Sequence, residues 1–142
     1  MTEVFFYTHA DNKLQTACTL TAKALARDMR VLLLTPDAAV TERLSKLLWS
    51  VPATGFVPHC RSADQLASVT PVIVDHEAQP LPHDQVLVNL CDQTPAFFSR
   101  FQRLVEIVGN EDTDREAARM RFRFYRDRGY QIRTHQLGAP AP

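Results

Sequence analysis

Short apolar runs alternate with longer segments of helical periodicity along most of this chain, and this alternation restricts the folds open to it. Residues 4–7 and 31–34 have the length and composition of buried strands, and each precedes a helical pattern, over residues 14–29 and 38–49. Strands that alternate with helices usually pair in parallel, with the helices lying on the faces of the sheet. The sequence therefore predicts an α/β fold, with an open, mostly parallel sheet and helices on both faces.

The same pattern continues towards the C-terminus. Further strands are predicted at residues 72–74, 85–90, 104–108 and 130–133, a short helix at 95–102 and a long helix at 112–128. Residues 51–58 contain two prolines and a glycine, which predict a turn-rich connection. A chain of 142 residues, 45% of them hydrophobic, suits a single core. We expect one domain over residues 1–136 and a flexible tail over residues 137–142.

Cysteine content and charge narrow the class of protein. The three cysteines form no CxxC pair, and no run of eighteen apolar residues could span a bilayer, so we expect a cytoplasmic protein without a membrane partner. Sixteen basic and sixteen acidic residues give a net charge of zero. Because general nucleic-acid binding rests on an excess of Lys and Arg, no direct specific nucleic-acid binding is expected. A partner that binds through charge must instead contact a local charged patch on the surface.

The usual signatures of catalysis and cofactor binding are missing. The first strand-to-helix turn, residues 8–13, has no glycine, and the four glycines of the chain fit neither common phosphate-binding motif. His59 and Cys60 are adjacent on an extended segment and point to opposite sides, which disfavours a nucleophile and base pair. We predict no cofactor, no metal site and no catalysis. The alternative is a small nucleotide-binding domain or enzyme with an atypical site at the carboxyl ends of the strands.

The predicted helix at residues 112–128 carries a basic face. A helical wheel at about 100° per residue places Arg115, Arg119, Arg123 and Arg126 within roughly 80° of one another, with Phe122 at the border of this face. Guanidinium groups beside an aromatic ring can hold carboxylates and an apolar side chain together. The arrangement is typical of a site for an acidic peptide that ends in a bulky residue.

Two other interpretations of this helix remain open. Local ion pairs, such as Glu116 with Arg119 and Arg123 with Asp127, would make it an ordinary solvated face. Only three acidic residues oppose six arginines between Asp114 and Arg128, so such neutralisation would be incomplete. Direct binding of single-stranded DNA by the arginines is the third possibility, and it predicts a steep dependence on salt.

A second candidate surface surrounds the only tryptophan. Trp49 and Phe56 lie in a segment that also has prolines at positions 52 and 58, and together they could anchor a partner. A loop packed against its own domain would look the same, because large aromatic side chains are mostly buried. The sequence leaves both interpretations open.

Four stretches of the chain resemble the chi subunit family of bacterial DNA polymerase III. They are residues 4–7, the block from residue 48 to His59 with its Trp-x-x-Pro and Phe-x-Pro-His spacing, residues 86–90 and residues 119–130. The likeness extends from about residue 3 to residue 135, and the tryptophan block is its most specific part. It implies a Rossmann-like fold and a noncatalytic accessory subunit of the clamp loader.

The resemblance also implies two partners. Chi subunits bind the acidic, Pro-Phe-ended C-terminal tail of the single-stranded-DNA-binding protein, and the corresponding positions in this chain are Val108, Arg115, Arg119, Phe122 and Arg123. A tyrosine is common where this chain has Phe122, so a phenol hydroxyl is lost while the apolar wall remains.

The tryptophan block of the family faces the psi subunit, which joins chi to the clamp loader. Trp49, Phe56 and Pro58 would have that role in this chain, with psi or another clamp-loader component as the partner. Arg126 matches neither set of family positions and is expected to flank the tail site.

Overall fold

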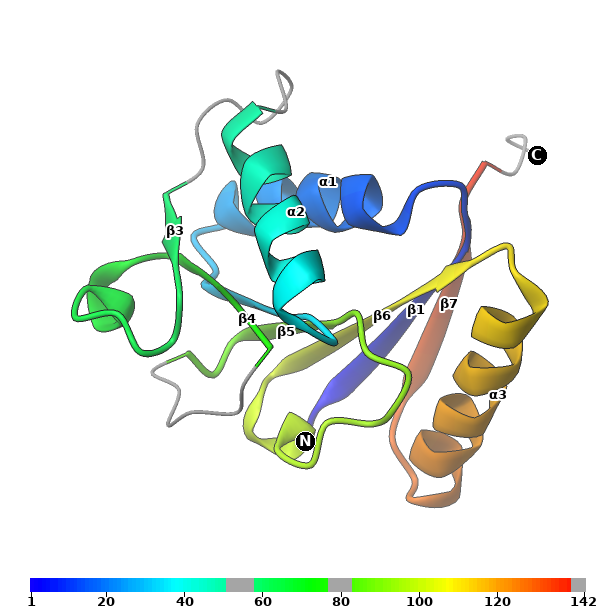
Figure 1. The fold of residues 1–142 in the computed structure, drawn as a ribbon. Helices are drawn as coiled ribbons and strands as arrows, with labels where there is room; N and C mark the ends of the chain where they lie inside the picture. The colour runs from blue at the N-terminus through cyan, green and yellow to red at the C-terminus, as the bar shows by residue number, and fades with distance from the viewer. Residues whose placement is uncertain (51–57, 77–82, 139–142) are drawn as a thin grey trace.

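A single seven-stranded sheet organises the chain (Figure 1). The computed structural model describes residues 1–50, 58–76 and 83–138. Among these residues the strand order is β3-β4-β2-β5-β6-β1-β7, and every neighbouring pair is parallel. The elements are β1 (Glu3–Ala10), α1 (Lys13–Leu25), β2 (Val31–Leu34), α2 (Ala38–Ser50), β3 (His59–Cys60), η1 (Ala67–Val69), β4 (Val72–Asp75), β5 (Val86–Asn89), η2 (Phe98–Arg100), β6 (Arg103–Gly109), α3 (Asp112–Asp127) and β7 (Ile132–Gln136).

Helices cover both faces of the sheet, which confirms the predicted fold class. Helices α1 and α2 lie on one face and α3 lies on the other (Figure 1). Side chains alternate between the faces along each strand, so Val31 and Leu33 of β2 join the core beneath α1 and α2, while Leu32 and Leu34 join the core beneath α3. Because both faces are covered, the central strands are apolar at almost every position.

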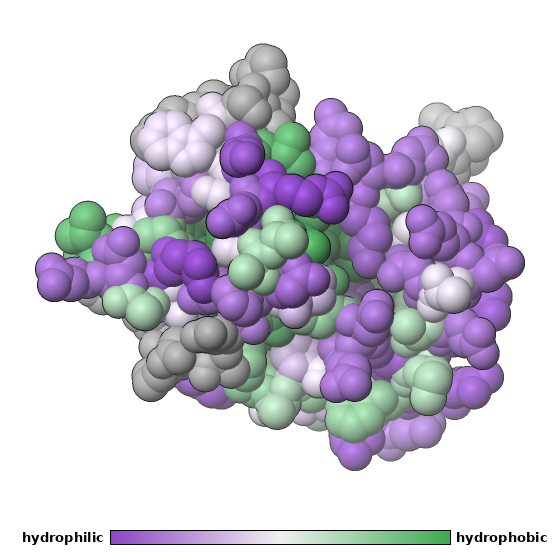
Figure 2. Space-filling model, in the orientation of Figure 1, coloured by the Kyte–Doolittle hydropathy of each residue, from purple (hydrophilic) through white to green (hydrophobic). Residues whose placement is uncertain are grey.

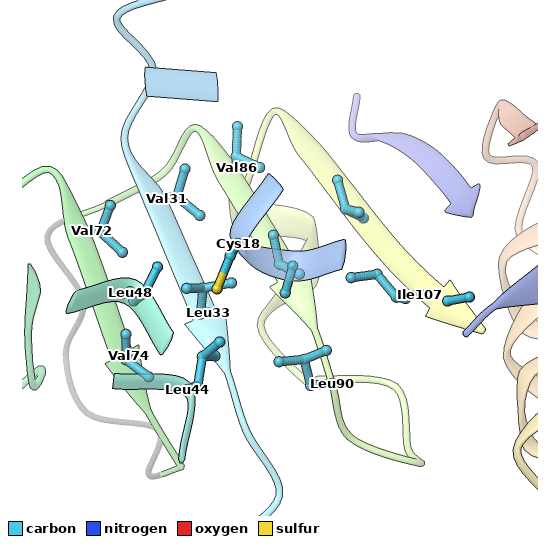
Figure 3. Packing of buried hydrophobic residues seen from close by; sticks show 14 residues of the cluster. Cys18, Val31, Leu33, Leu44, Leu48, Val72, Val74, Val86, Leu90 and Ile107 are labelled. Carbon is cyan, nitrogen blue, oxygen red and sulfur yellow. The ribbon is translucent and has the colours of Figure 1, made fainter. Parts of the chain in front are cut away.

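The core beneath α1 and α2 is built from aliphatic side chains and one thiol (Figure 3). Cys18 of α1 and Leu44 and Leu48 of α2 have no exposed surface and pack onto the valines and leucines of the strands. Burial raises the pKa of the Cys18 thiol to about 11, so this cysteine is a core residue and not a nucleophile.

Left-handed residues end two helices and explain two differences from the sequence prediction. Asp28, with φ of 58°, follows α1, and the N–H of Met29 donates to the carbonyl of Ala24, so the helix ends before residue 29. Gly129, with φ of 81°, has the same role after α3, where the N–H of Tyr130 donates to the carbonyl of Tyr125. The last strand therefore begins at Ile132 rather than at residue 130.

Other parts of the sequence prediction need correction. The helix expected at residues 95–102 is only the single turn η2, and the two-residue strand β3 was not predicted. Leu137, the first residue of the expected tail, donates its N–H to the carbonyl of Thr8, while residues 139–142 lie outside the described residues, so the tail over 137–142 stays a prediction. Most of the turn-rich segment at 51–58 lies outside the described residues. No helix in the described ranges is long and apolar enough to cross a membrane.

Candidate functional site

A cavity of about 310 Å³ lies between α3 and the ends of strands β1, β6 and β7. Four of the five residues predicted to bind an acidic tail line it, namely Val108, Arg115, Arg119 and Phe122. Arg123, the fifth, is exposed one turn further along α3 and is not part of the lining. The described residues that line it are Phe6, Thr8, His9, Val108, Gly109, Arg115, Ala118, Arg119, Phe122 and Thr134.

The apolar side of this cavity is held in place by the core. Val108 of β6 and Phe6 of β1 are buried, and both belong to the cluster beneath α3. Phe122 is half-buried, and its ring centroid lies 5.4 Å from that of Phe6 at an interplanar angle of 60°. Tilted aromatic pairs at such distances are favourable, so the apolar wall is pre-organised for an apolar side chain.

The basic side of the cavity is unneutralised within the described part of the chain. There, no carboxylate lies within ion-pair distance of Arg115, Arg119 or Arg123. The local pairs that the sequence left open are therefore absent, and Asp127 approaches Arg126 instead, at 3.3 Å. The outer surface of α3 is largely hydrophilic in the view of Figure 2. The arrangement offers guanidinium groups to a carboxylate beside an apolar hollow.

The start of α3 is tied to the start of α1 by a polar contact that the sequence did not predict. The Asp114 carboxylate accepts hydrogen bonds from the Gly109 N–H, at 2.6 Å, and from Lys13 Nζ, at 2.9 Å. Burial acts to raise the pKa of Asp114, but these donors outweigh it and the pKa is lowered. The Asp114 carboxylate therefore accepts from two donors near the strand ends, the Gly109 N–H and Lys13 Nζ, which could otherwise have bound a phosphate.

A buried polar network joins the other face of α3 to the sheet. Glu106 of β6 has no exposed surface, and it accepts hydrogen bonds from Arg121 Nε at 3.0 Å, Tyr125 Oη at 2.6 Å and Asn89 Nδ2 at 3.1 Å. Arg121 Nη1 also donates to the carbonyl of Asp92, at 2.7 Å. Burial raises the pKa of Glu106, while Arg121 and the hydrogen bonds from Tyr125 and Asn89 oppose this rise.

The pairing of Arg121 with Glu106 changes which charges of α3 are neutralised. The local sequence sets only three acidic residues against six arginines on this helix, but Arg121 is buried and is paired with Glu106 from a neighbouring strand. The one signal for this pair in the sequence is a glutamate inside an otherwise apolar strand. Arg121 is not one of the four arginines of the predicted basic face, so that face keeps its residues, and only the count of arginines opposed by local acids falls from six to five.

The surface around the tryptophan is partly described. Trp49, near the end of α2, is 61% exposed. The centroids of the Trp49 and His59 rings lie 5.8 Å apart, and the two rings are roughly perpendicular. Ser45 Oγ and His59 Nε2 are 2.7 Å apart, which fixes the imidazole on which Trp49 rests. Pro58 is exposed nearby in sequence, and Phe56 lies outside the described residues. The exposure of Trp49 argues against a side chain packed into its own domain.

Possible metal ligands do not gather into a cluster within the described ranges. In these ranges no group of three or more His, Cys, Asp and Glu side chains is placed to hold a metal ion. Asp75, a buried acid at the end of β4, accepts hydrogen bonds from Arg61 Nη2 and from the N–H groups of Ser62 and His76. These contacts give Asp75 a structural role.

The fold and the cavity define a class, an α/β protein of the Rossmann-like type whose first strand-to-helix turn has no glycine-rich phosphate loop. The family model described as DNA polymerase III chi subunit, HolC, matches residues 1–133. The chain therefore belongs to the DNA polymerase III chi subunit family.

Three relatives support this assignment, each named DNA polymerase III subunit chi. The protein of Pseudomonas aeruginosa is 38% identical over 96% of this chain and 98% of the relative. Those of Escherichia coli and Haemophilus influenzae are 29% and 26% identical, over 84% and 86% of this chain and 82% and 85% of the relatives. The likeness thus covers the cavity and the tryptophan surface together.

Proposed function

We propose that this chain is a noncatalytic accessory subunit of the DNA polymerase III holoenzyme in DNA replication, linking the clamp loader to the single-stranded-DNA-binding protein through that protein's acidic C-terminal tail. Membership of the chi subunit family supports the polymerase assembly as its place of action. The observation that carries the proposal is the cavity beside α3, where an apolar hollow adjoins guanidinium groups without an ion-pair partner among the described residues.

In this proposal the tail binds with its terminal aromatic residue in the hollow. Phe122 and Val108 pack against that side chain, and Arg115 and Arg119 hold carboxylates beside it. A hydrogen bond to a charged group contributes about 1.5 to 3 kcal/mol, so two arginines can give useful affinity to a short peptide. Arg123 is exposed on the next turn and meets acidic residues further from the end of the tail.

The Trp49 surface is proposed as the contact with the clamp loader, through a psi subunit or another component. An exposed tryptophan held against His59 presents a large, ordered contact area. Tryptophan is among the residues that most often dominate protein interfaces. Pro58 borders this surface, and the family resemblance adds Phe56 to it.

The tail site is tested by titrating a labelled peptide with an acidic, Pro-Phe-ended sequence against the wild type and Arg119→Ala. Loss of one charge-assisted contact is expected to weaken binding by about 1.5 to 3 kcal/mol at moderate salt. Arg126→Ala is the matched control, because Arg126 shares the helix but lies outside the cavity and pairs with Asp127. Equal affinity of wild type and Arg119→Ala would remove the proposed site.

The nucleotide-binding alternative has one observation in its favour, a larger hollow of about 880 Å³ at the carboxyl ends of the strands. Among the described residues, four acidic ones line it against two basic ones, Lys13 and Arg43, and Lys13 is already paired with Asp114. This charge opposes phosphate binding. Thermal unfolding with a nucleotide panel is a cheap test, since a ligand at a hundred times its dissociation constant stabilises by about 2.7 kcal/mol.

A further inference from the structure

A third hollow, of about 340 Å³, lies on the opposite face of the sheet from the tail site. It opens between α1 and the strands β6, β1 and β7, where α1 does not cover the sheet completely. Val86, Val88 and Val105 contribute its aliphatic base, and Leu20 and Ala24 of α1 form one side. Apolar surface of this kind, accessible from solvent, is typical of an interaction site.

Basic side chains surround this hollow. Lys23 projects from α1, Arg27 from the turn that follows it, Arg103 from β6 and His135 from β7, and none of the described residues of the lining is acidic. Within the described ranges, no ion pair involves Lys23, Arg27 or Arg103. An apolar hollow with a basic rim is complementary to an acidic ligand that carries an apolar group.

We propose that this hollow is a docking site for an acidic peptide segment that inserts one bulky apolar side chain. The side chain would bury itself against Val105 and Ala24, while carboxylates on either side of it meet Lys23, Arg27 and Arg103. This site is separate from the tail site, because successive residues of β1 point to opposite faces. Phe5 and Tyr7 line the new hollow, whereas Phe6 and Thr8 line the cavity beside α3.

A peptide fits this site better than single-stranded nucleic acid does. Nucleic-acid strands without sequence preference are held by aromatic faces on which bases stack. The Arg103 guanidinium lies over the Phe5 ring, 5.8 Å from its centroid, and the Tyr7 ring stacks on His135 at 5.1 Å with an interplanar angle of 21°. These contacts occupy one face of each ring and so reduce the aromatic surface on which bases could stack. The hollow between them is aliphatic, which suits a protein side chain.

The test uses full-length Arg119→Ala protein, so that the tail site is already weakened and the two sites are read separately. The probe is a fluorescein-labelled synthetic peptide of aspartates and glutamates around one internal phenylalanine, with an amidated C-terminus. Binding is followed by fluorescence anisotropy at low and moderate salt. We expect this protein to bind the probe, and the further double substitution Lys23→Glu with Arg27→Glu to weaken binding by about tenfold or more.

The matched control is Arg43→Glu with Arg126→Glu, which makes the same change in net charge at two exposed positions outside the hollow and should leave affinity within about twofold. Ala24→Phe fills the hollow without changing the charge and should also remove binding, which keeps the test valid if the charge reversal disturbs folding. The proposal is overturned if Arg119→Ala does not bind the probe, or if both variants bind it unchanged. Binding of labelled oligothymidine that is lost in the charge reversal, with no peptide binding, would identify a nucleic-acid site instead.

Discussion

The two faces of the sheet are covered by different kinds of contact. Beneath α1 and α2 the core is aliphatic, with Cys18 and Leu44 packed onto valines and leucines (Figure 3). Beneath α3 the sheet meets aromatic rings and the buried Glu106–Arg121 pair. Aliphatic packing tolerates small shifts if volume is conserved, whereas charged hydrogen bonds accept one geometry. The difference indicates that α3 is held at a fixed rotation about its axis, which fixes the arginines on its other side.

The arginines of α3 show how one residue type has two roles on one helix. Arg121 points into the molecule and is matched by Glu106, so its charge supports the fold. Arg119, two residues earlier, is exposed and lines the cavity. Because these two side chains project about 160° apart on a helix, fixing the first directs the second outwards.

Removing Arg121 is the strongest test of the polar face. Arg121→Met keeps the length of the side chain but leaves Glu106 buried without its cation. Breaking a buried pair from one side costs about 3 to 5 kcal/mol, and we expect a loss of that size in the free energy of unfolding measured with urea. Arg126→Ala, an exposed change on the same helix, should stay within about 0.5 kcal/mol of wild type.

The double substitution Arg121→Met with Glu106→Leu completes this test. Replacing both charges by apolar groups removes the uncompensated carboxylate, so most of the lost stability should return. If the double variant were as unstable as Arg121→Met, the cost would come from packing, and the distinction between the two faces would fail. The affinity of the double variant for the tail peptide shows whether α3 has kept its rotation about its axis.

Leu44→Ala tests the aliphatic face. Leu44 of α2 is fully buried against the sheet, and truncation of such a leucine costs about 2 to 5 kcal/mol through lost burial and the cavity left behind. The effect on stability should rival that of Arg121→Met. Tail-peptide affinity should be unchanged under conditions where the variant is fully folded, since α3 lies on the other face. A weakened tail site in the folded variant would show that the faces are coupled.

The smallest expected effect concerns the polar contact at the start of α3. The pKa of Asp114 is held below its usual value, so this carboxylate stabilises the fold above the unfolded-state pKa of about 3.9 and loses that contribution as the pH falls through its lower folded-state value. Asp114→Asn should cost about 1 kcal/mol at pH 7, given its partial exposure. The difference in unfolding free energy should shrink below about pH 4. A constant difference from pH 7 to pH 3 would contradict the assignment.

The sequence predicted the sheet because both of its faces are buried, which makes the strands continuous apolar runs such as Val31–Leu34. It also aligned Arg115 and Arg119, because helical periodicity fixes which residues share a face. Val108 entered the predicted site only through the family resemblance. Its place beside α3 depends on the order of strands in the sheet, which no local pattern specifies.

The same limit explains what the sequence missed. Thr8 and Thr134 line the cavity because β7 pairs with β1, and Glu106 meets Arg121 because β6 lies beneath α3. Each pairing joins residues that are distant in the chain or depends on how a helix is rotated over the sheet. A glutamate inside an apolar strand predicts a buried partner but does not identify it.

The central claim is that the cavity beside α3 receives the acidic tail, and backbone amide NMR tests it most directly. The ¹⁵N-labelled chain is titrated with an acidic, Pro-Phe-ended peptide. The proposal predicts that the largest shift changes cluster at Val108, Gly109, Ala118 and Thr134, and that they largely disappear in Arg119→Ala. Largest changes around Trp49, or changes at these four residues that saturate at the same peptide concentration in Arg119→Ala, would contradict it.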